Sequence, residues 1–488
     1  MPIPRSFKTD ESFLEKIAIG AIGTRRIFDH LMAIGHHPIE LERGSMNYKI
    51  WKKIKIKRVR VPDLLCTACG VRVESRAKTK LLITMSHSES SPERGWDYGL
   101  TDDDHVGLVL CEHTGESPVD WTASDLVQYV QVKHLREAFR SKKVVTEKPK
   151  GAGEGFEIRV TWPAVIASSQ GTVAEIKKDR LKYKRAKDGR HITVQLQKRG
   201  VELTPNVTVG QEVLQSRILA SIVPVSTRIE CQGGVTEDRY IRELESASLS
   251  DRYAAAKALG AMGAHSAVEV LSGKIGEERE HLYVRLEAAA SLVRLGEHGA
   301  FKTLENFLTN EYLENQLETV IILGEIPHPE SARLLIKTLK DQERNSEIRA
   351  GAAWAIGELK SQQGLAALIE CFGTVETEIR IEAARALVKL ARDSKGPVLA
   401  GFSESKPEER AGIAWALGKA GNVRVTDLID RLVDEDTRQW AAWVLGSQNS
   451  AKLTDGIEQL KEKDPEVYFA ITVLWKIMSS WAYGLEEY

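Results

Sequence analysis

The chain has 488 residues, 42% hydrophobic and 28% charged, a composition typical of a folded globular protein with room for two to four domains. No apolar run approaches the ~18 residues that a membrane helix needs, and the opening residues lack a charged-then-apolar signal pattern. Five cysteines, an odd and sparse set, argue against a disulfide framework and predict a reducing, cytoplasmic compartment.

The net charge of −1 conceals two parts of opposite sign. Residues 1–229 contain 38 Lys and Arg against 27 Asp and Glu, whereas residues 230–488 contain 30 against 42. A basic segment suits a polyanionic partner and an acidic segment does not. We therefore expect nucleic acid, in the first place DNA, to bind through residues 1–229.

Residues 11–35 show the apolar spacing of an amphipathic helix that ends near Gly35. Glu15 lies in its first turn, where an acid interacts favourably with the helix dipole. His36 and His37 close the helix, and we expect them to cap its C-terminus rather than to bind a metal.

Residues 49–60, KIWKKIKIKRVR, contain seven basic residues and no acid. Their apolar alternation predicts a strand that is partly buried on one face. The cations of the other face either follow a phosphate backbone or are simply solvated. The candidate nucleic-acid contacts in this strand are Lys52, Lys53, Lys55 and Lys57.

The pattern around which the rest is organised occupies residues 59–80. Two apolar-alternating runs flank the tight turn CTACG at residues 66–70, which predicts a β-hairpin with a cysteine knuckle at its tip. Side chains alternate across a strand, so the polar residues of the second run share one face. They are Arg72, Glu74, Arg76 and Lys78.

Pairing of the two cysteines across the turn would place Asp63 opposite Arg72 and diagonal to Glu74. The sequence Pro62-Asp63, followed by Glu74 and basic residues on the same face, resembles the active-site hairpin of the PD-(D/E)XK nuclease superfamily, which includes restriction endonucleases. The resemblance covers roughly residues 10–120.

This resemblance implies Mg²⁺-dependent hydrolysis of phosphodiester bonds, with Asp63 and Glu74 as metal ligands. The family lysine belongs two residues after the second acid, where this chain has Arg76, and Lys78 follows on the same face. Arg76 and Lys78 are therefore the candidates to orient water or stabilise transition-state charge. Related nucleases often place a helical glutamate beside the metal, which makes Glu15 a further candidate.

The cysteine pair of the turn also has the spacing of a zinc knuckle. Residues 105–111 are predicted to form a buried strand, with further ligands at its end. We predict a closed, structural Zn²⁺ site, with ordinary reduced thiols as the alternative; its ligands would be Cys66, Cys69, Cys111 and His113. Cys231 and Cys371 are expected to take no part in it.

A helix is predicted at residues 123–142 and a Lys/Gly-rich linker at 148–155, so that an α/β nuclease-like domain occupies residues 1–147. Residues 156–229 change to short strand-like runs, which predicts a small all-β domain. Its pattern resembles a barrel-sandwich hybrid module, as in biotinyl domains, although no biotinyl or lipoyl lysine motif is present.

Within this second domain, residues 177–190 place eight basic residues and Tyr183 in fourteen positions. We interpret the stretch as a candidate nucleic-acid contact, with a solvated hairpin tip as the alternative. Its cations are Lys177, Lys178, Arg180, Lys182, Lys184, Arg185, Lys187 and Arg190.

From about residue 236 the chain repeats every 28 to 33 residues, and each unit has the pattern of two short helices with Ala and Gly at close contacts. The pattern resembles HEAT repeats, particularly the short phycobilisome-lyase-like form, and implies an α-solenoid over residues 236–488. One position is arginine in six of the eight units, and we expect it to pair with acids of neighbouring repeats: Arg252, Arg285, Arg349, Arg380, Arg410 and Arg438.

Three tryptophans share a register five residues after this arginine: Trp354, Trp415 and Trp443. We interpret them as packing residues, with an aromatic strip that binds a partner as the alternative. The aromatic residues 474–488 are predicted to cap the array.

The predicted fold class is therefore multidomain: an α/β domain, a small all-β domain and an all-α solenoid. The leading hypothesis is a metal-dependent DNA nuclease on a HEAT scaffold, suited by analogy to restriction or defence, with no membrane partner. The alternative is a non-catalytic adaptor that binds nucleic acid or, through the array, a protein. Bilin lyase activity would rest on the repeat alone, and fold does not decide among these functions.

Overall fold

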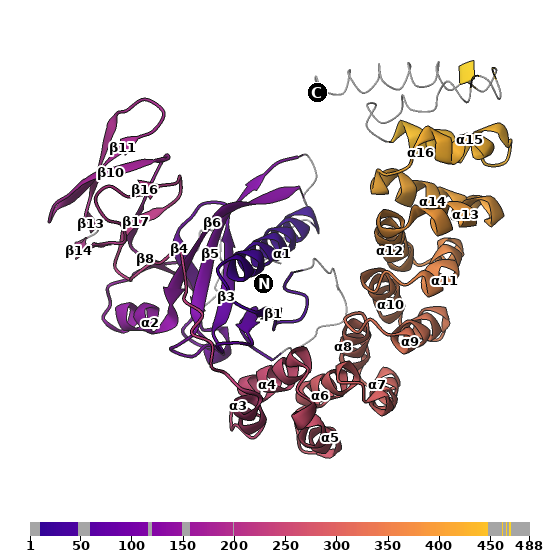
Figure 1. Cartoon of the computed structure of the whole chain (residues 1–488), viewed down its shortest axis with the longest axis horizontal. Helices are drawn as coiled ribbons and strands as arrows, with labels where there is room; N and C mark the ends of the chain where they lie inside the picture. The colour runs from indigo at the N-terminus through magenta and orange to yellow at the C-terminus, as the bar shows by residue number, and fades with distance from the viewer. Residues whose placement is uncertain are drawn as a thin grey trace, which may run out of the picture. The chain divides into compact units, whose positions relative to one another are not determined.

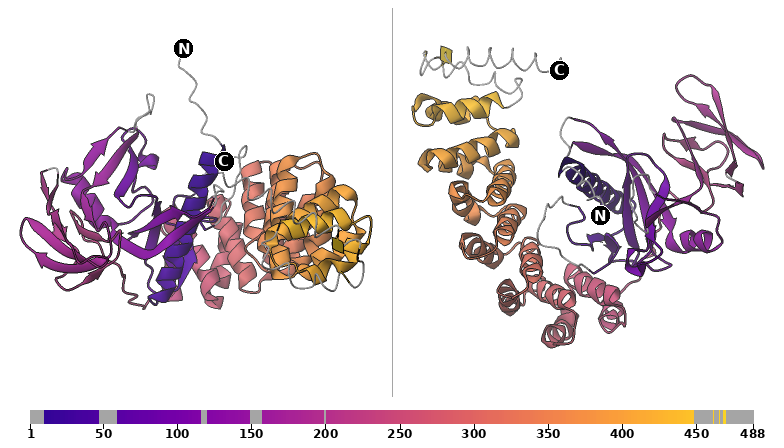
Figure 2. Two further views of the ribbon diagram at one scale, coloured as in Figure 1. Left: turned by 90° about the horizontal axis from the view of Figure 1, so that it is seen from above. Right: turned by 180° about the vertical axis from the view of Figure 1, so that it is seen from behind.

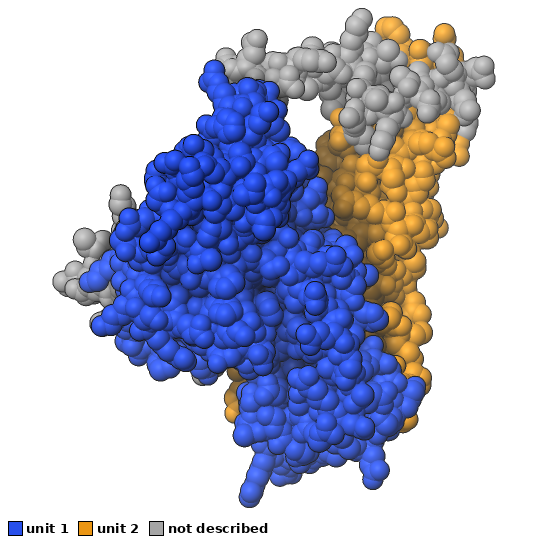
Figure 3. Space-filling model, turned by 60° about the vertical axis from the view of Figure 1, so that its left-hand side comes forward, with its two compact units in different colours: residues 1–50, 58–291 blue, residues 51–57, 292–488 orange. Residues whose placement is uncertain are grey.

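The computed structural model (Figure 1, Figure 2) describes residues 10–46, 59–115, 120–148, 157–198 and 200–447, and four isolated positions at 461, 465, 468 and 469. The chain divides into two compact units, which are residues 1–50 with 58–291 and residues 51–57 with 292–488 (Figure 3). Among the described residues, no helix is long and apolar enough to cross a membrane.

The first unit begins with α1 (Asp10–Ala33), which packs against β3, β5 and β6 of a five-stranded sheet (Figure 1). Its strand order is β1-β2-β3-β5-β6, with bounds Pro38–Glu40, Leu64–Cys66, Arg72–Lys78, His105–His113 and Trp121–Gln131. Only β3 and β5 run parallel; the other neighbours in this sheet are antiparallel. Ile27 and Leu31 of α1 are buried with Val73 of β3, so this helix covers one face of β3.

The hairpin predicted at residues 59–80 is present as β2 and β3, but its register differs from the prediction. Leu65 lies opposite Arg72, so the ladder continued to the start of β2 places Asp63 opposite Glu74. Side chains directly opposite on antiparallel strands have Cβ atoms about 5 Å apart. Asp63 is therefore the direct neighbour of Glu74 rather than its diagonal one.

The turn of this hairpin explains the difference in register. The Cys66 N–H donates to the Val71 carbonyl over 2.8 Å, and the Gly70 N–H donates to the Cys66 carbonyl over 2.8 Å. Cys66 therefore pairs with Val71, and Cys69 lies within the loop. Gly70 adopts a φ of +73°, which glycine tolerates at little cost.

Residues 123–142, predicted as one helix, divide into the end of β6 and α2 (Val132–Arg140). Val127 and Tyr129 of β6 are buried in the core beneath α1. This period of two fits a strand, and its pairing with β5 provides the backbone hydrogen bonds. The helical prediction is correct only for the second half of the segment.

A second sheet of the first unit has the strand order β4-β8-β7 (Ile83–Ser88, Glu157–Trp162 and Val145–Glu147). The short 3₁₀ helix η1 (Pro92–Arg94) follows β4. Trp162 anchors this sheet on α2, because its Nε1–H donates to the Leu135 carbonyl over 3.1 Å. β8, which follows the predicted linker, thus pairs with strands that precede it.

The region that follows is built from strands and turns throughout its described residues, in agreement with the predicted all-β class. One sheet has the order β12-β11-β10-β16, which are His191–Gln195, Arg180–Arg185, Gly171–Ile176 and Glu212–Val213. The other sheets are β15-β17-β9 and β13-β14, with bounds Thr204–Pro205, Ile218–Ser221, Ala164–Ile166, Gln197–Lys198 and Val201–Glu202. Val173, Leu181 and Leu219 contribute to their shared core.

Helices account for the secondary structure of every described segment after residue 236. The first unit contains α3 (Glu237–Glu243), α4 (Leu249–Met262), η2 (His265–Ala267) and α5 (Val268–Gly276), and the border between the units falls within α6 (Leu282–Arg294). In the second unit α8, α10, α12, α14 and α16 contact one another in a row (Figure 1). The helical repeat region predicted from the period is confirmed.

The helices of this row are α8 (Leu313–Leu323), α10 (Ser346–Glu358), α12 (Thr377–Asp393), α14 (Pro407–Ala420) and α16 (Arg438–Gly446). Two elements precede this row, η3 (His298–Ala300) and α7 (Phe301–Leu308). Between its helices along the chain come α9 (Pro329–Lys340), η4 (Gln362–Gly364), α11 (Leu365–Glu370), η5 (Cys371–Gly373), α13 (Lys395–Glu404) and α15 (Val425–Val433). The residues after 447, including the predicted terminal cap, lie almost entirely outside the described part of the chain.

At three of its positions, the recurring arginine binds the end of the helix that precedes its own. Arg285 Nε donates to the Ile275 carbonyl over 3.0 Å, and Arg349 Nε donates to the Leu339 carbonyl over 3.0 Å. Arg438 binds the last carbonyls of α15 in the same way. The last carbonyls of a helix have no partner within it, so these bonds give the arginine a structural role at these three positions.

The predicted pairing of these arginines with acids of the next repeat is present at Arg252 and at Arg349. Arg252 forms a bidentate pair with Glu280 at 2.9 and 3.0 Å, and Arg349 lies 3.3 Å from Glu376. The arginine column therefore joins successive repeats as well as capping helices.

Candidate anion-binding cavity and metal centre

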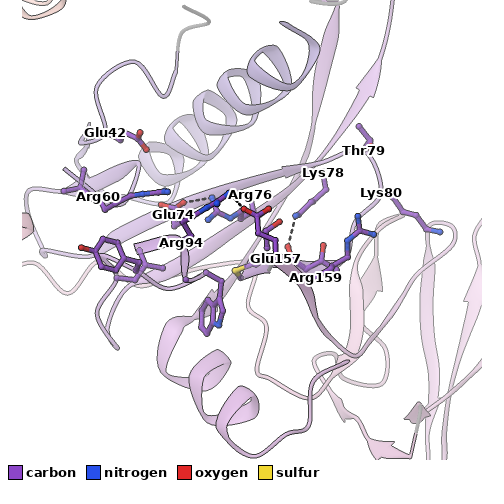
Figure 4. A pocket seen from close by; sticks show the side chains of 18 residues that line it. Glu42, Arg60, Glu74, Arg76, Lys78, Thr79, Lys80, Arg94, Glu157 and Arg159 are labelled. Atoms are coloured by element: carbon purple, nitrogen blue, oxygen red, sulfur yellow. Dashed lines mark hydrogen bonds and ion pairs between the residues drawn. The ribbon is translucent and has the colours of Figure 1, made fainter. Parts of the chain in front are cut away.

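Glu74, Arg76 and Lys78 of β3 line a cavity of about 690 Å³ (Figure 4). Val73, whose side chain points to the opposite face of the strand, packs toward α1, so the cavity lies on the sheet face that α1 does not cover. Six cations line the cavity, namely Arg60, Arg76, Lys78, Lys80, Arg94 and Arg159, against the three acids Glu42, Glu74 and Glu157. This excess of positive charge favours an anionic ligand.

Glu74, the second acid of the nuclease resemblance, forms an ion pair with Arg76, two residues further along β3. Arg76 Nη1 donates to the Glu74 carboxylate and also to the Ser75 carbonyl, the latter over 3.1 Å. The Glu74 side chain is only 13% exposed, so this ion pair lies mostly away from solvent. The guanidinium therefore supplies the positive charge that a metal ion would supply in a nuclease.

Asp63, the first acid, is buried at the start of β2. Its Oδ2 accepts a hydrogen bond from the Ser75 N–H over 2.7 Å. Burial raises the pKa of this carboxyl well above its ordinary value, and the neighbouring Glu74 and Glu42 raise it further. A carboxyl that favours its protonated form is a poor metal ligand until a cation approaches it.

We expect Asp63→Asn to raise the free energy of unfolding at neutral pH. The pKa of Asp63 is raised in the folded state, so the stability linked to its proton is complete below about pH 4 and is lost as pH rises through the folded-state pKa. Asparagine stays neutral and can still accept the Ser75 N–H. Urea unfolding at about pH 5 and about pH 8 should show an advantage of the variant that grows with pH. An advantage that shrinks as pH rises would contradict this assignment.

Lys78 reaches the same cavity, where its Nζ donates to the Thr84 carbonyl over 2.8 Å. Burial lowers the pKa of this amine to about 8, and the nearby Arg76 and Arg159 contribute to the shift. Lys78 is therefore a cation at pH 7 that loses its charge within the accessible pH range.

The structure does not bring Glu15 to these residues. Glu15 belongs to α1, which packs on the other face of β3: a Cβ added at Gly23 of this helix would lie 2.4 Å from the Ala77 Cβ. Because Glu74 points away from that face, the packing of α1 does not support the predicted catalytic role of Glu15. The dipole interpretation of Glu15 fits its position at the start of the helix.

Half of the candidate nucleic-acid contacts of residues 177–190 are paired with acids. Glu175 binds Lys177 at 2.6 Å and Lys182 at 3.3 Å, and Asp188 binds Arg185 and Arg190. The stretch forms a turn, β11 and a second turn, with Leu181 and Tyr183 buried beneath it. Its charge available to a phosphate backbone is therefore smaller than its composition indicates. Lys52, Lys53, Lys55 and Lys57 lie outside the described residues.

A second cluster lies at the opposite end of β3, at the knuckle. Ligand atoms of His36, Cys66, Cys69 and Cys231 all lie within 4.8 Å of one another. In the described part of the chain, no other group of three or more His, Cys, Asp or Glu residues has this geometry, so Asp63 and Glu74 belong to none. A hydrogen bond from the Cys69 thiol lowers the pKa of Cys66 to about 4.

This geometry corrects the predicted zinc ligands, because Cys111 and His113 lie at the far end of the sheet. In the β3–β5 ladder Lys78 faces Leu110, so Cys111 is removed from the knuckle by about six residues, or ~20 Å of strand. Cys111 packs toward α1, and the His113 ring lies against Trp121 with ring centroids 5.0 Å apart.

His36 and Cys231, which lie in the cluster in place of Cys111 and His113, are not among the ligands predicted from the sequence. The sequence predicts no role in metal binding for Cys231 and a helix-capping role for His36. Only the Cys66–Cys69 spacing is local, whereas the other two residues reach the knuckle through the fold. Cys371 belongs to the second unit, where its thiol donates to the Ala367 carbonyl over 3.1 Å.

The tryptophan register of the array is only partly a packing feature. Trp354 is buried, with Lys389 Nζ 5.7 Å from the centroid of its ring. Trp415 and Trp443 keep 37% and 41% of their surface exposed. The packing interpretation therefore holds for the first of the three tryptophans.

Two family models match the helical region. The model of HEAT repeats matches residues 308–388, and the model of the phycobilisome lyase HEAT-like repeat matches residues 251–272. These matches support HEAT repeats at residues 251–272 and 308–388 of the helical region. None of the curated proteins matches the chain.

Solved structures with some likeness include the complex of CpcE and CpcF of phycocyanin lyase from Nostoc, at 18% identity over 51% of this chain and 97% of that chain (TM-score 0.27). A computationally designed armadillo repeat protein is 17% identical over 44% of this chain and 100% of its own (TM-score 0.25). Human deoxyhypusine hydroxylase is 18% identical over 44% and 85% (TM-score 0.19). Values this low support no conclusion about function.

Proposed function

We propose that this protein is a non-catalytic adaptor, in which the cationic cavity binds a phosphate-bearing polyanion, in the first place nucleic acid, and the HEAT repeats bind a protein. The observation that carries the proposal is the ion pair of Arg76 with Glu74 inside the cavity. It neutralises the acid on which the implied hydrolysis would depend.

A catalytic Mg²⁺ requires carboxylate oxygens that are free to reach it in near-octahedral geometry. Glu74 would have to leave Arg76, and Asp63 would have to give up its proton in a buried position. Both changes oppose metal binding. The cavity therefore suits a ligand that brings negative charge more than it suits a divalent cation.

The rim of the cavity supplies what a phosphate ligand needs. Arg60, Lys80 and Arg159 are exposed there, and Lys78 lies deeper. Tyr98, half exposed at the same rim, offers a ring on which a base can stack. Cations for the backbone beside an aromatic surface are the usual elements of single-strand binding.

The array contributes the protein-binding part of the proposal. Solenoids of stacked helix pairs offer extended surfaces to partners. Trp415 of α14 and Trp443 of α16 lie on adjacent helices that contact each other, and both remain partly exposed. Tryptophan is enriched among the residues that carry most of the binding energy at protein interfaces.

We expect binding of a fluorescein-labelled single-stranded oligonucleotide to weaken severalfold between about pH 7 and about pH 9, because Lys78 loses its proton near pH 8. Lys78→Arg keeps its charge throughout and should remove most of that dependence. Lys187→Arg, an exposed substitution in the β11–β12 turn, is the matched control and should behave like the parent protein. Fluorescence anisotropy at constant salt measures all three; an unchanged pH dependence in Lys78→Arg would contradict the proposed role of the cavity.

The second candidate is the Mg²⁺-dependent nuclease. The observation in its favour is the position of Asp63 beside Glu74 on neighbouring strands, with Lys78 on the same face as Glu74. In this function, substrate and metal would together displace Arg76 from Glu74, and Lys78 would take the part of the family lysine.

A further inference from the structure

Three segments that are distant in sequence bring four potential metal ligands to one point of the first unit. His36 follows α1, Cys66 and Cys69 belong to the knuckle between β2 and β3, and Cys231 lies in the segment before α3. Their ligand atoms all lie within 4.8 Å of one another.

The distances within this group match a tetrahedral site. Cys66 Sγ lies 3.9 Å from Cys231 Sγ, and Cys69 Sγ lies 3.5 Å from His36 Nδ1. With Zn–S bonds of about 2.3 Å and Zn–N bonds of about 2.0 Å, the edges of a tetrahedron are roughly 3.5–3.8 Å. A disulfide would need sulfurs only about 2.05 Å apart.

Neighbouring backbone groups hold the ligands in the orientation that a metal requires. His36 Nε2 lies 3.0 Å from the Ile229 carbonyl, which can only accept, so Nε2 carries the proton and Nδ1 directs its lone pair toward Cys69. The His37 N–H donates to Cys66 Sγ over 3.3 Å, as expected for a thiolate. Such bonds fix the tautomer and direction of ligands around metal ions.

We propose that His36, Cys66, Cys69 and Cys231 bind one Zn²⁺ as a closed structural site. Three sulfurs and one imidazole nitrogen are a donor set of tetrahedral structural zinc sites. All four positions belong to the protein, so the ion has no open position for a substrate or water.

The position of this site gives it a structural consequence that is independent of the proposed adaptor function. The segment from Cys231 to α3 lies along the knuckle, where the Val235 N–H donates to the Ala68 carbonyl over 3.1 Å. In α3, the Tyr240 hydroxyl lies 3.5 Å from the Thr67 carbonyl. A bound ion would therefore fasten the start of the first repeat helices to the five-stranded sheet.

Elemental analysis of the purified full-length chain tests the site. We expect about one zinc per chain in the parent protein, in Cys111→Ser and in Cys371→Ser, and a small fraction of that in Cys231→Ser and His36→Ala. His36→Cys should retain the metal, and its Co²⁺ form should show a stronger thiolate charge-transfer band than the parent Co²⁺ form. This rescue separates loss of a ligand from loss of folding.

Several results would overturn the proposal. They are a parent chain without stoichiometric zinc, a mass that shows a disulfide among Cys66, Cys69 and Cys231, and zinc that persists in Cys231→Ser but is lost in Cys111→Ser. Failure of His36→Cys to hold metal while the parent does would equally exclude His36 as a ligand.

Discussion

Replacing Glu287 by alanine is expected to lower the free energy of unfolding of the first unit by about 3–5 kcal/mol. Glu287 of α6 accepts a hydrogen bond from Arg43 Nη2, and the two side chains are 0% and 1% exposed. Removal of the carboxylate leaves the guanidinium buried without this opposite charge, so the ion pair no longer offsets the cost of its desolvation. Urea unfolding monitored by circular dichroism measures the loss.

Two comparisons make this prediction sharp. The double variant Arg43→Met with Glu287→Leu should recover most of the lost stability, because it removes both charges. Glu330→Ala removes the acid of a pair with Arg333 whose side chains are 32% and 51% exposed, and it should cost no more than about 1 kcal/mol. If Glu287→Ala and Glu330→Ala lower the free energy of unfolding equally, burial does not make the Arg43–Glu287 pair more important for stability, and the prediction is wrong.

Gly357→Val should destabilise the HEAT repeats of the second unit by about 3 kcal/mol. A Cβ at Gly357 of α10 would lie 2.7 Å from the Cα and 2.8 Å from the Cβ of Ala386 in α12. The obstructing atom is backbone, so the helices themselves would have to separate.

Gly373→Ala is the matched control, because a Cβ at Gly373 meets no atom within 4 Å. It should change the unfolding free energy by no more than about 0.5 kcal/mol. Thermal unfolding followed by helical circular dichroism compares the two variants. Similar midpoints for both would mean that α10 and α12 do not pack as closely as described.

The helical array could be predicted from the sequence because the repeat period and the small residues at contacts are local signals. Gly357 against Ala386 is one such contact. The helix-capping role of the arginines is harder to predict, because nothing in the sequence marks the carbonyl that Arg349 binds. Only the recurrence of the residue was visible.

The candidate site was predictable in part for the same reason. Alternation along β3 placed Glu74, Arg76 and Lys78 on one face, and the structure retains that face. The predicted pairing of Asp63 with Arg72 is wrong because the register depends on the turn. In that turn Cys66 pairs with Val71 rather than with Cys69.

The metal ligands could not be completed from spacing. Cys66 and Cys69 are neighbours in sequence, whereas Cys231 arrives from a segment 162 residues after Cys69. Cys111 is a reasonable zinc ligand from the sequence because it lies at the end of a recognisable strand. The parallel pairing of β3 with β5, however, places Cys111 at the end of the sheet opposite the knuckle. Long-range pairing of this kind has no local signal.

The most direct test of the proposed adaptor function measures nucleic-acid binding and cleavage in the same reaction. Full-length protein is mixed with labelled single-stranded and duplex oligonucleotides in Mg²⁺, with anisotropy for binding and a denaturing gel for cleavage. We predict salt-sensitive binding that Lys80→Ala with Arg159→Ala weakens, and no cleavage with or without Asp63→Asn. Mg²⁺-dependent cleavage that Asp63→Asn or Glu74→Gln abolishes, with binding retained, would contradict the adaptor and establish the nuclease.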